Sequence, residues 1–148
     1  MIRTLSILAC LLFIVPAHAQ RRPNLVPPGW NQEMADEATK TRRFVSPDGA
    51  SSLVTRQTRA RHAELNRDME EIASGEGERI TYHRRGPSWI AVSGYRGGQI
   101  FYRKSNLACG GTRWHHVELL YPREQKLRMD STVTYIARGM TRYHDDCG

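Results

Sequence analysis

Alternating apolar and polar positions between Glu78 and Tyr121 predict four consecutive β-strands. Each run is rich in β-branched or aromatic residues, which favour strands, and each gap contains the glycine or proline that a turn needs. Because the gaps are short, neighbouring strands should run antiparallel, as a meander. The predicted strands are Glu78–Arg84, Trp89–Tyr95, Gln99–Lys104 and Arg113–Tyr121.

The second of these strands, Trp89–Tyr95, predicts a sheet that is covered on both faces. Both alternating sets of its first four residues are largely apolar, as in strands that are buried on two sides, so Trp89 is expected in the core. In the last strand, successive side chains alternate between the faces. His115 and His116 should therefore point to opposite sides of the sheet.

Two further strands and two helices flank the meander. The turn Pro47–Gly49 predicts a hairpin, because proline presets φ at the second turn position, aspartate bonds its own backbone and glycine accepts a positive φ. Apolar residues at spacings of three and four predict the helices. The order β-β-α-β-β-β-β-α predicts an α+β domain, an antiparallel meander sheet with two helices packed on one face. The flanking elements are the strands Phe44–Ser46 and Ser51–Thr55 and the helices Thr58–Ser74 and Arg123–Met140.

Residues 1–19 are typical of a signal peptide. Arg3 supplies positive charge, Leu5–Val15 is an apolar run too short to span a bilayer, and Ala17–Ala19 offers small residues for cleavage. We therefore expect a periplasmic or secreted protein that begins at Gln20 and has no transmembrane span after processing. Cys10 lies within the apolar run, which leaves its lipidation as an alternative.

Residues 20–43 are interpreted as a flexible, proline-rich leader, and residues 44–148 as a single α+β domain. The prolines of this leader oppose a regular ladder of backbone hydrogen bonds. Glu33–Lys40 could form two helical turns, but they would have no apolar face. Trp30 is the exception in this polar segment, and docking onto the domain is its expected role.

The chain is basic, with 22 lysine and arginine residues against 15 aspartate and glutamate residues and a net charge of +7. That balance favours an anionic partner or serves solubility alone. Several basic residues lie at turns and strand ends among Tyr82, Tyr95, Tyr102 and Trp114. The possible anion-binding set is Arg84, Arg85, Arg103 and Lys104. Charged side chains also protect exposed sheet edges from aggregation, so both interpretations stay open. Export argues against nucleic acid as the partner.

Two cysteines follow the signal peptide, and the predicted elements bring Cys109 and Cys147 together as a disulfide. The strand from Arg113 leads away from Cys109 by about 30 Å, at roughly 3.3 Å per residue. The helix to Met140 returns about 26 Å, at roughly 1.5 Å per residue, so its end should arrive beside Cys109. A secreted chain with two cysteines commonly spends them on such a bridge.

A free thiol at Cys109 would support a different function. Beside His115 or His116 it could form a thiolate pair and serve a small cell-envelope hydrolase. A metal site is not expected, because the chain has no Cys-x-x-Cys or His-Glu-x-x-His and the adjacent histidines point apart. No cofactor is expected either, since no glycine-rich phosphate motif is present.

The element order, opened by Phe44–Gly49, resembles the PsbP-like fold of small secreted or lumenal proteins, from Phe44 to about Met140. The glycine-rich, cysteine-containing loop before a Trp-His strand is also similar to that of uncharacterised small periplasmic proteins of Gram-negative bacteria. Members of the PsbP-like group are mostly accessory binding proteins. The resemblance therefore implies binding rather than catalysis.

The sequence thus favours a periplasmic or secreted, non-enzymatic accessory or binding module. We expect a monomer whose partner is an envelope protein or an anionic ligand. Two alternatives remain: the hydrolase built around Cys109, His115 and His116, and an inhibitor or interaction protein that engages a partner through residues 20–43. A bridge at Cys109 favours the module, whereas a free thiol favours the hydrolase.

Overall fold

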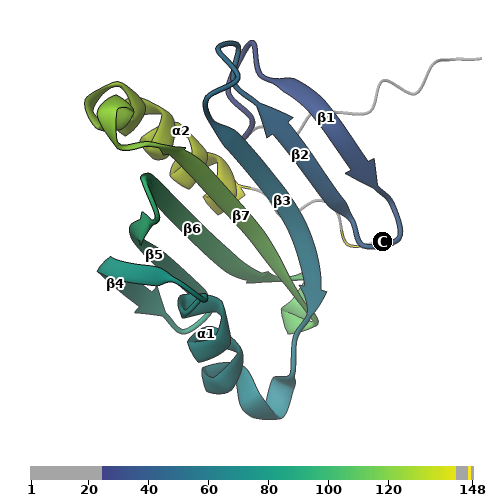
Figure 1. Ribbon diagram of the computed structural model, residues 1–148. Coiled ribbons are helices and arrows are strands. Elements are labelled where there is room, and N and C mark those ends of the chain that lie inside the picture. The colour runs from purple at the N-terminus through teal and green to yellow at the C-terminus, as the bar shows by residue number, and fades with distance from the viewer. Residues whose placement is uncertain (1–24, 143–146, 148) are drawn as a thin grey trace, which may run out of the picture.

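The computed structural model describes residues 25–142 and Cys147, so the predicted signal peptide and its cleavage site lie outside the described residues. A seven-stranded antiparallel sheet and two α-helices make up this part of the chain (Figure 1), which confirms the α+β class. Within residues 25–142, no helix is long and apolar enough to cross a membrane. The strands are β1 (Asn31–Asp36), β2 (Thr41–Val45), β3 (Ser52–Arg59), β4 (Glu78–Gly86), β5 (Trp89–Arg96), β6 (Gln99–Ala108) and β7 (Arg113–Pro122), and the helices are α1 (Leu65–Ala73) and α2 (Lys126–Arg142).

The sheet consists of two meanders that meet at one central pair of strands. Its order is β1-β2-β3-β7-β6-β5-β4, so β3 and β7 join the two halves. The predicted meander is confirmed as β4 to β7, in which each strand pairs with the next. The predicted hairpin is confirmed as β2 and β3, where the backbone N–H of Ser46 donates to the carbonyl of Ser51 across the turn.

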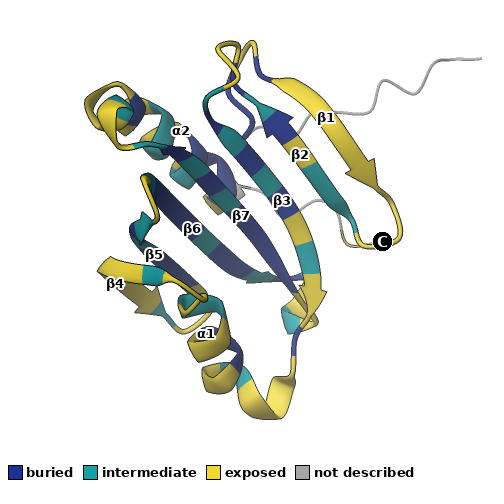
Figure 2. Cartoon of the chain, viewed as in Figure 1, coloured by how far each residue is buried: buried dark blue, intermediate teal, exposed yellow. Residues whose placement is uncertain are grey.

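Burial is greatest in the middle of the sheet and decreases toward both edges (Figure 2). Most residues of β6 and β7 are buried, whereas all of β1 and nearly all of β4 are exposed. The two edge strands carry mostly polar or charged side chains, which is how natural sheets keep their edges from pairing with other chains. Polar edge strands therefore frame a hydrophobic centre.

The two helices cover opposite faces of the sheet, which corrects the expectation that both pack on one face. Met69 of α1 packs in a cluster with Trp114, whereas Ile136 of α2 packs in a cluster with Val117. Trp114 and Val117 are three positions apart in β7, so their side chains point to opposite faces. Figure 1 shows α1 in front of the sheet and α2 behind it. The predicted two-sided cover of β5 is confirmed, because this strand contributes to both clusters.

The segment interpreted as a flexible leader, residues 20–43, belongs to the domain over its described part. Glu33–Lys40, which the sequence would allow to form two helical turns, instead lies in β1 and the turn that follows it. Leu25, Val26 and Trp30 are buried in the cluster on the α2 side, so the predicted docking of Trp30 is confirmed. Residues 25–43 are therefore part of the folded domain, and a role of this segment in engaging a partner stays a prediction.

Gly139 allows the N-terminal segment to reach this cluster. A Cβ at Gly139 would lie 2.6 Å from the Cα of Leu25, closer than real Cβ atoms approach a backbone. Because glycine has no side chain, Leu25 can pack directly against α2 and is fully buried. Gly139 is thus a packing residue of α2, not only a weak point of the helix.

Trp89 does not lie in the core, contrary to expectation. It stands at the start of β5 with 36% of its surface exposed, and its indole lies directly over Gly86, where it leaves no room for a Cβ. The Nζ of Lys104 lies 5.9 Å from the centre of its ring. The fully buried tryptophan is Trp114, which is 1% exposed.

Candidate functional site

A groove on the α2 side of the sheet is the candidate functional site. It lies between α2 and the strands β4 to β7, and its volume of about 610 Å³ is typical of sites for small molecules. The aromatic residues that line it are Tyr82, Tyr95, Tyr102 and Tyr121.

Strand register places two of the tyrosines on either side of a small residue. Tyr82 of β4 pairs with Ser93 of β5, and Ser93 pairs with Tyr102 of β6. The Oγ of Ser93 donates a hydrogen bond to the carbonyl of Phe101, at 2.7 Å. The side chain of Ser93 is thus short and bonded to the backbone, and Ser93 lines the groove together with the two tyrosines.

The other two tyrosines, Tyr95 and Tyr121, lie on the same face of the sheet, beside the first pair. Tyr95 pairs with Ile100, and Ile100 pairs with Tyr121 of β7. The guanidinium carbons of Arg79 and Arg123 lie 4.8 and 4.3 Å from the centre of the Tyr95 ring, within the range of a cation–π contact. These contacts hold the Tyr95 ring in place at the groove.

The groove carries more positive than negative charge. The Nζ of Lys104 donates hydrogen bonds to the carbonyl of Ala137, at 3.0 Å, and to the Oγ1 of Thr141, at 3.1 Å. Burial lowers the pKa of Lys104. The charged residues of the lining are the cations Lys104, Lys126 and Arg138 and the single carboxylate Asp130.

Two phenols of the groove, Tyr102 and Tyr121, are buried and keep their protons at neutral pH. Burial, with a smaller contribution from Tyr82, raises the pKa of Tyr102 to about 12. Burial, together with Asp130, also raises the pKa of Tyr121. Protonated phenols can donate as well as accept hydrogen bonds, so the groove floor combines flat rings with neutral donors.

The structure divides the four residues of the predicted anion-binding set. Arg84 and Lys104 both pair with the same residue of β5, so they lie on the α2 side of the sheet, while Arg85 lies on the α1 side. Arg103 is 7% exposed and cannot face a surface ligand, which corrects its place in the set. An anion-binding role for the exposed Arg84 and Arg85 stays a prediction.

Arg103 belongs instead to an ion-pair network on the α1 side. Its Nη2 lies 2.6 Å from Oε1 of Glu78 and 2.7 Å from Oε2 of Glu118, and Arg96 contacts the same two carboxylates at 2.5 and 3.1 Å. The Nη1 of Arg103 also donates a hydrogen bond to the carbonyl of Ile72 in α1, at 2.9 Å. Burial raises the pKa of Glu78, but hydrogen bonds from the two arginines outweigh this, and its pKa lies below the usual value. The network therefore stays charged and anchors α1 to the sheet.

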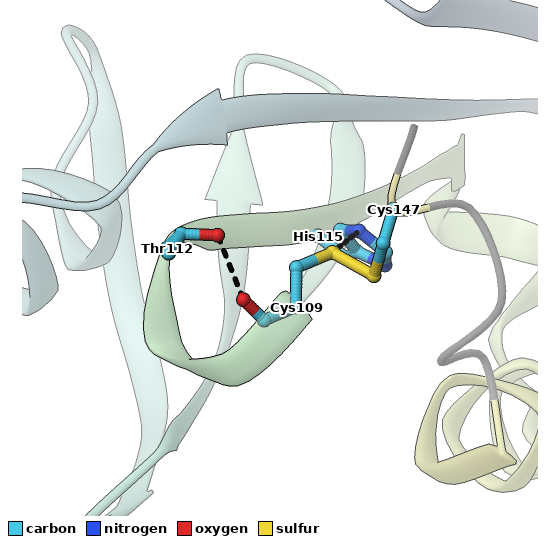
Figure 3. Close-up of a disulfide and its surroundings, with 4 residues drawn as sticks. All are labelled: Cys109, Thr112, His115 and Cys147. Carbon is cyan, nitrogen blue, oxygen red and sulfur yellow. Dashed lines mark hydrogen bonds between the residues drawn. A yellow bond between two sulfur atoms is a disulfide. The ribbon is translucent and has the colours of Figure 1, made fainter.

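Cys109 and Cys147 form the predicted disulfide, with their Cα atoms 5.4 Å apart (Figure 3). The bridge joins cysteines that are 38 positions apart, and closing such a loop stabilises the fold by about 4 kcal/mol in the chain-entropy account of disulfides. Nε2 of His115 lies 3.6 Å from Sγ of Cys109, while His116 points to the opposite face, as predicted. In this bridged state, the thiolate that the hydrolase alternative requires is absent.

His116 lies in a polar contact that the sequence did not reveal. Its Nε2 lies 2.7 Å from Oγ1 of Thr58 and its Nδ1 2.8 Å from Oγ of Ser105. A neutral imidazole has one donor and one acceptor, so one hydroxyl donates and the other accepts. Burial, followed by the charge of Arg56, lowers the pKa of His116 to about 3. An imidazole with so low a pKa is a weak general base, and we assign this contact a structural role.

Because the neutral form of His116 is favoured in the folded state, acid should destabilise the protein. The unfolded histidine has a pKa of about 6.5, so this contribution is complete above pH 6.5 and is lost as the pH falls toward 3. Proton linkage predicts a loss of about 1.5 kcal/mol between pH 6.5 and pH 5. Urea denaturation at both pH values measures it, and His116→Gln should show a smaller pH dependence. An equal slope in the two proteins would contradict this assignment.

The sequence pointed to only part of the groove. Tyr82, Tyr95 and Tyr102 stood out as aromatics near basic residues, but Tyr121 and the residues of α2 did not. Alternation along each strand predicts which side chains share a face. It does not predict which helix closes over them, so the groove itself could not be found.

Comparison with known proteins adds no family assignment. No protein-family model matches the chain, and no curated protein matches it. The PsbP-like resemblance therefore stays a prediction, and the function of this chain has to be argued from the tyrosine-lined groove.

Proposed function

We propose that this chain is a periplasmic or secreted, non-enzymatic binding module that binds a small anionic ligand with a flat apolar part. The observation that carries the proposal is the groove between α2 and the sheet, where four tyrosines and three cations surround about 610 Å³. The ligand lies against the phenol rings and directs its anionic group toward the lysines and the arginine.

Each part of this ligand has a counterpart in the groove. Tyrosine rings offer large, rigid surfaces that favour flat or aromatic groups. Lys126 and Arg138 are exposed at the rim on α2, where they can approach a carboxylate, sulfonate or phosphate. Lys104 is already hydrogen-bonded to α2 and contributes positive charge from the floor. Asp130 is the one opposing charge of the lining.

Export is the second part of the proposal. It is supported by the signal-peptide pattern of residues 1–19 and by the disulfide, since such bridges persist in oxidising compartments. The PsbP-like resemblance agrees with a small accessory binding protein. Intact mass of exported protein, with a first residue of Gln20, tests this part without reference to the ligand.

A pair of fluorescent naphthylamine probes tests the groove. 8-Anilinonaphthalene-1-sulfonate carries a sulfonate, and N-phenyl-1-naphthylamine has the same aromatic rings without a charge. We expect the anionic probe to bind about tenfold more tightly at low salt. This preference should decrease at 1 M NaCl, because the Debye length falls to about 3 Å. Equal affinities for the two probes would contradict the anionic specificity.

Matched variants locate the binding. Lys126→Gln should weaken the sulfonate probe by roughly two- to fivefold, the scale of a contact worth about 0.5–1 kcal/mol, and leave the neutral probe unchanged. Tyr82→Ser should weaken both probes. Arg56→Gln removes a positive charge on the opposite side of the sheet, where Arg56 pairs with His116, and should change neither. If Arg56→Gln acts like Lys126→Gln, the groove is not the binding site.

A further inference from the structure

A second site lies at the disulfide, on the α2 side of the sheet. Sγ of Cys109, Sγ of Cys147 and a ring nitrogen of His115 all lie within 4.8 Å of one another. His115 is fully buried, and Figure 3 shows its ring beside the bridge. Two thiolates and an imidazole are ligands that soft metal ions prefer.

We propose that reduction of the Cys109–Cys147 bridge creates a binding site for one Cu(I) ion, held by both thiolates and by Nε2 of His115. The oxidised protein cannot bind the metal at this site, because the two sulfurs are bonded to each other. The site therefore couples copper binding to the redox state of the surroundings. It is independent of the tyrosine-lined groove.

The geometry of the bridged state already approaches that of the metal site. With a metal–sulfur distance of about 2.3 Å and a metal–nitrogen distance of about 2.0 Å, a tetrahedral or trigonal ion places sulfur and nitrogen roughly 3.5–3.7 Å apart. Nε2 of His115 and Sγ of Cys109 are 3.6 Å apart. These two ligands are therefore spaced for one ion before the bridge opens.

The remaining ligand, Cys147, is the one that has to move. When both sulfurs bind one ion, they separate to roughly 4 Å. Cys147 is exposed, so its side chain can move away without repacking the core. On the other side of the bridge, Gly110 and Gly111 follow Cys109 and both adopt positive φ, a conformation that glycine tolerates without strain.

The redox step balances with a dithiol as the reductant. The dithiol supplies two electrons and two protons, the S–S bond breaks, Cys109 and Cys147 become thiols, and the reductant becomes a disulfide. The exposed Cys147 is open to attack by the thiolate of the reductant. Binding of Cu(I) then displaces the two thiol protons, while neutral His115 contributes the lone pair of Nε2.

The number of ligands favours Cu(I) over zinc. Structural zinc sites are almost always four-coordinate, and among the described residues the cluster contains only three histidine, cysteine or acidic ligands. Cu(I) prefers soft thiolates and is satisfied by three ligands. We therefore expect the reduced protein to take Cu(I) in preference to Zn(II).

Anaerobic titration of the full exported protein tests the proposal. Protein reduced with a phosphine, and untreated oxidised protein, are each titrated with Cu(I) in competition with a coloured Cu(I) chelator. We expect one Cu(I) per reduced chain and none per oxidised chain. X-ray absorption at the copper edge should show two sulfur ligands and one nitrogen ligand. Equal binding by the oxidised protein, or binding of Zn(II) but not of Cu(I), would overturn the proposal.

Two histidine variants identify the nitrogen ligand. His115→Gln should weaken Cu(I) binding by more than the roughly 10- to 100-fold that is typical of losses outside the ligand shell. His62→Gln is the matched control, because His62 is exposed and lies near Gly111 in the loop that follows Cys109. The affinity of this variant for Cu(I) should stay unchanged. If His115→Gln does not fold, the X-ray absorption spectrum of the copper-loaded wild-type protein is the test. A spectrum with sulfur ligands alone would contradict the assignment of His115.

Discussion

Trp114→Ala should lower the free energy of unfolding by roughly 3–5 kcal/mol, the cost of truncating a large aromatic residue in a core. Trp114 is 1% exposed and packs with Met69 of α1 and Phe101 of β6. Its Nε1 also donates to Oδ2 of Asp68, at 2.9 Å, and this carboxylate is 5% exposed. The variant therefore leaves a cavity and removes a hydrogen bond to α1. Urea denaturation followed by circular dichroism measures the loss.

Trp89→Ala is the matched control for this prediction. Trp89 is 36% exposed and covers a glycine at the end of a hairpin, so its truncation should cost no more than about 1 kcal/mol. The two variants remove the same side chain from one sheet. Similar losses for both would mean that Trp114 does not form the centre of the α1 layer.

Arg103→Met should also cost roughly 3–5 kcal/mol, because it removes one partner of a buried ion pair. The Glu78 side chain is only 1% exposed and would keep its charge with one arginine instead of two. The hydrogen bond to the carbonyl of Ile72 in α1 would be lost as well. Equilibrium unfolding in urea at pH 7 measures this effect.

Two further variants test whether the network is the cause. Arg85→Met removes an exposed arginine from β4 and should change stability by less than about 0.5 kcal/mol. Combining Arg103→Met with Glu78→Gln removes the uncompensated charge, so the double variant should lose less than the sum of the single losses. A loss below about 1 kcal/mol for Arg103→Met alone would show that Arg96 suffices for both carboxylates.

The meander from β4 to β7 could be predicted because local chemistry determines it. Each strand combines β-branched or aromatic residues with an adjacent turn sequence, and neighbouring strands pair with each other. The disulfide could be predicted for a different reason, since a strand and a returning helix of similar length bring Cys147 back to Cys109.

β1 could not be predicted, because its sequence lacks the signal on which strand assignment depends. All six of its residues are exposed, so no alternation of apolar and polar positions marks it. It forms because its backbone pairs with β2. The nearby prolines suggested a leader, although Leu25, Val26 and Trp30 were the apolar residues that tie this segment to the core.

The faces of the helices and the role of Arg103 depend on long-range packing. A helical stripe shows that a helix has an apolar side, but not which face of the sheet it covers. The two-sided apolar character of β5 already required cover on both faces, and this signal argued against placing both helices together. Arg103 was grouped with surface cations, although Glu78 and Glu118, the two carboxylates of the meander, are its partners.

The pairing of β3 with β7 determines how quickly the sheet can be completed. Its register joins Ser52 to Leu120 and Arg59 to Arg113, positions that are far apart along the chain. All the other pairings in the sheet join strands that follow one another in the sequence. Hairpins form within about 1–10 μs, but long-range pairing must first overcome the entropy of closing a long loop. We therefore expect the two meanders to form first and their docking along β3 and β7 to limit the rate at which the sheet is completed.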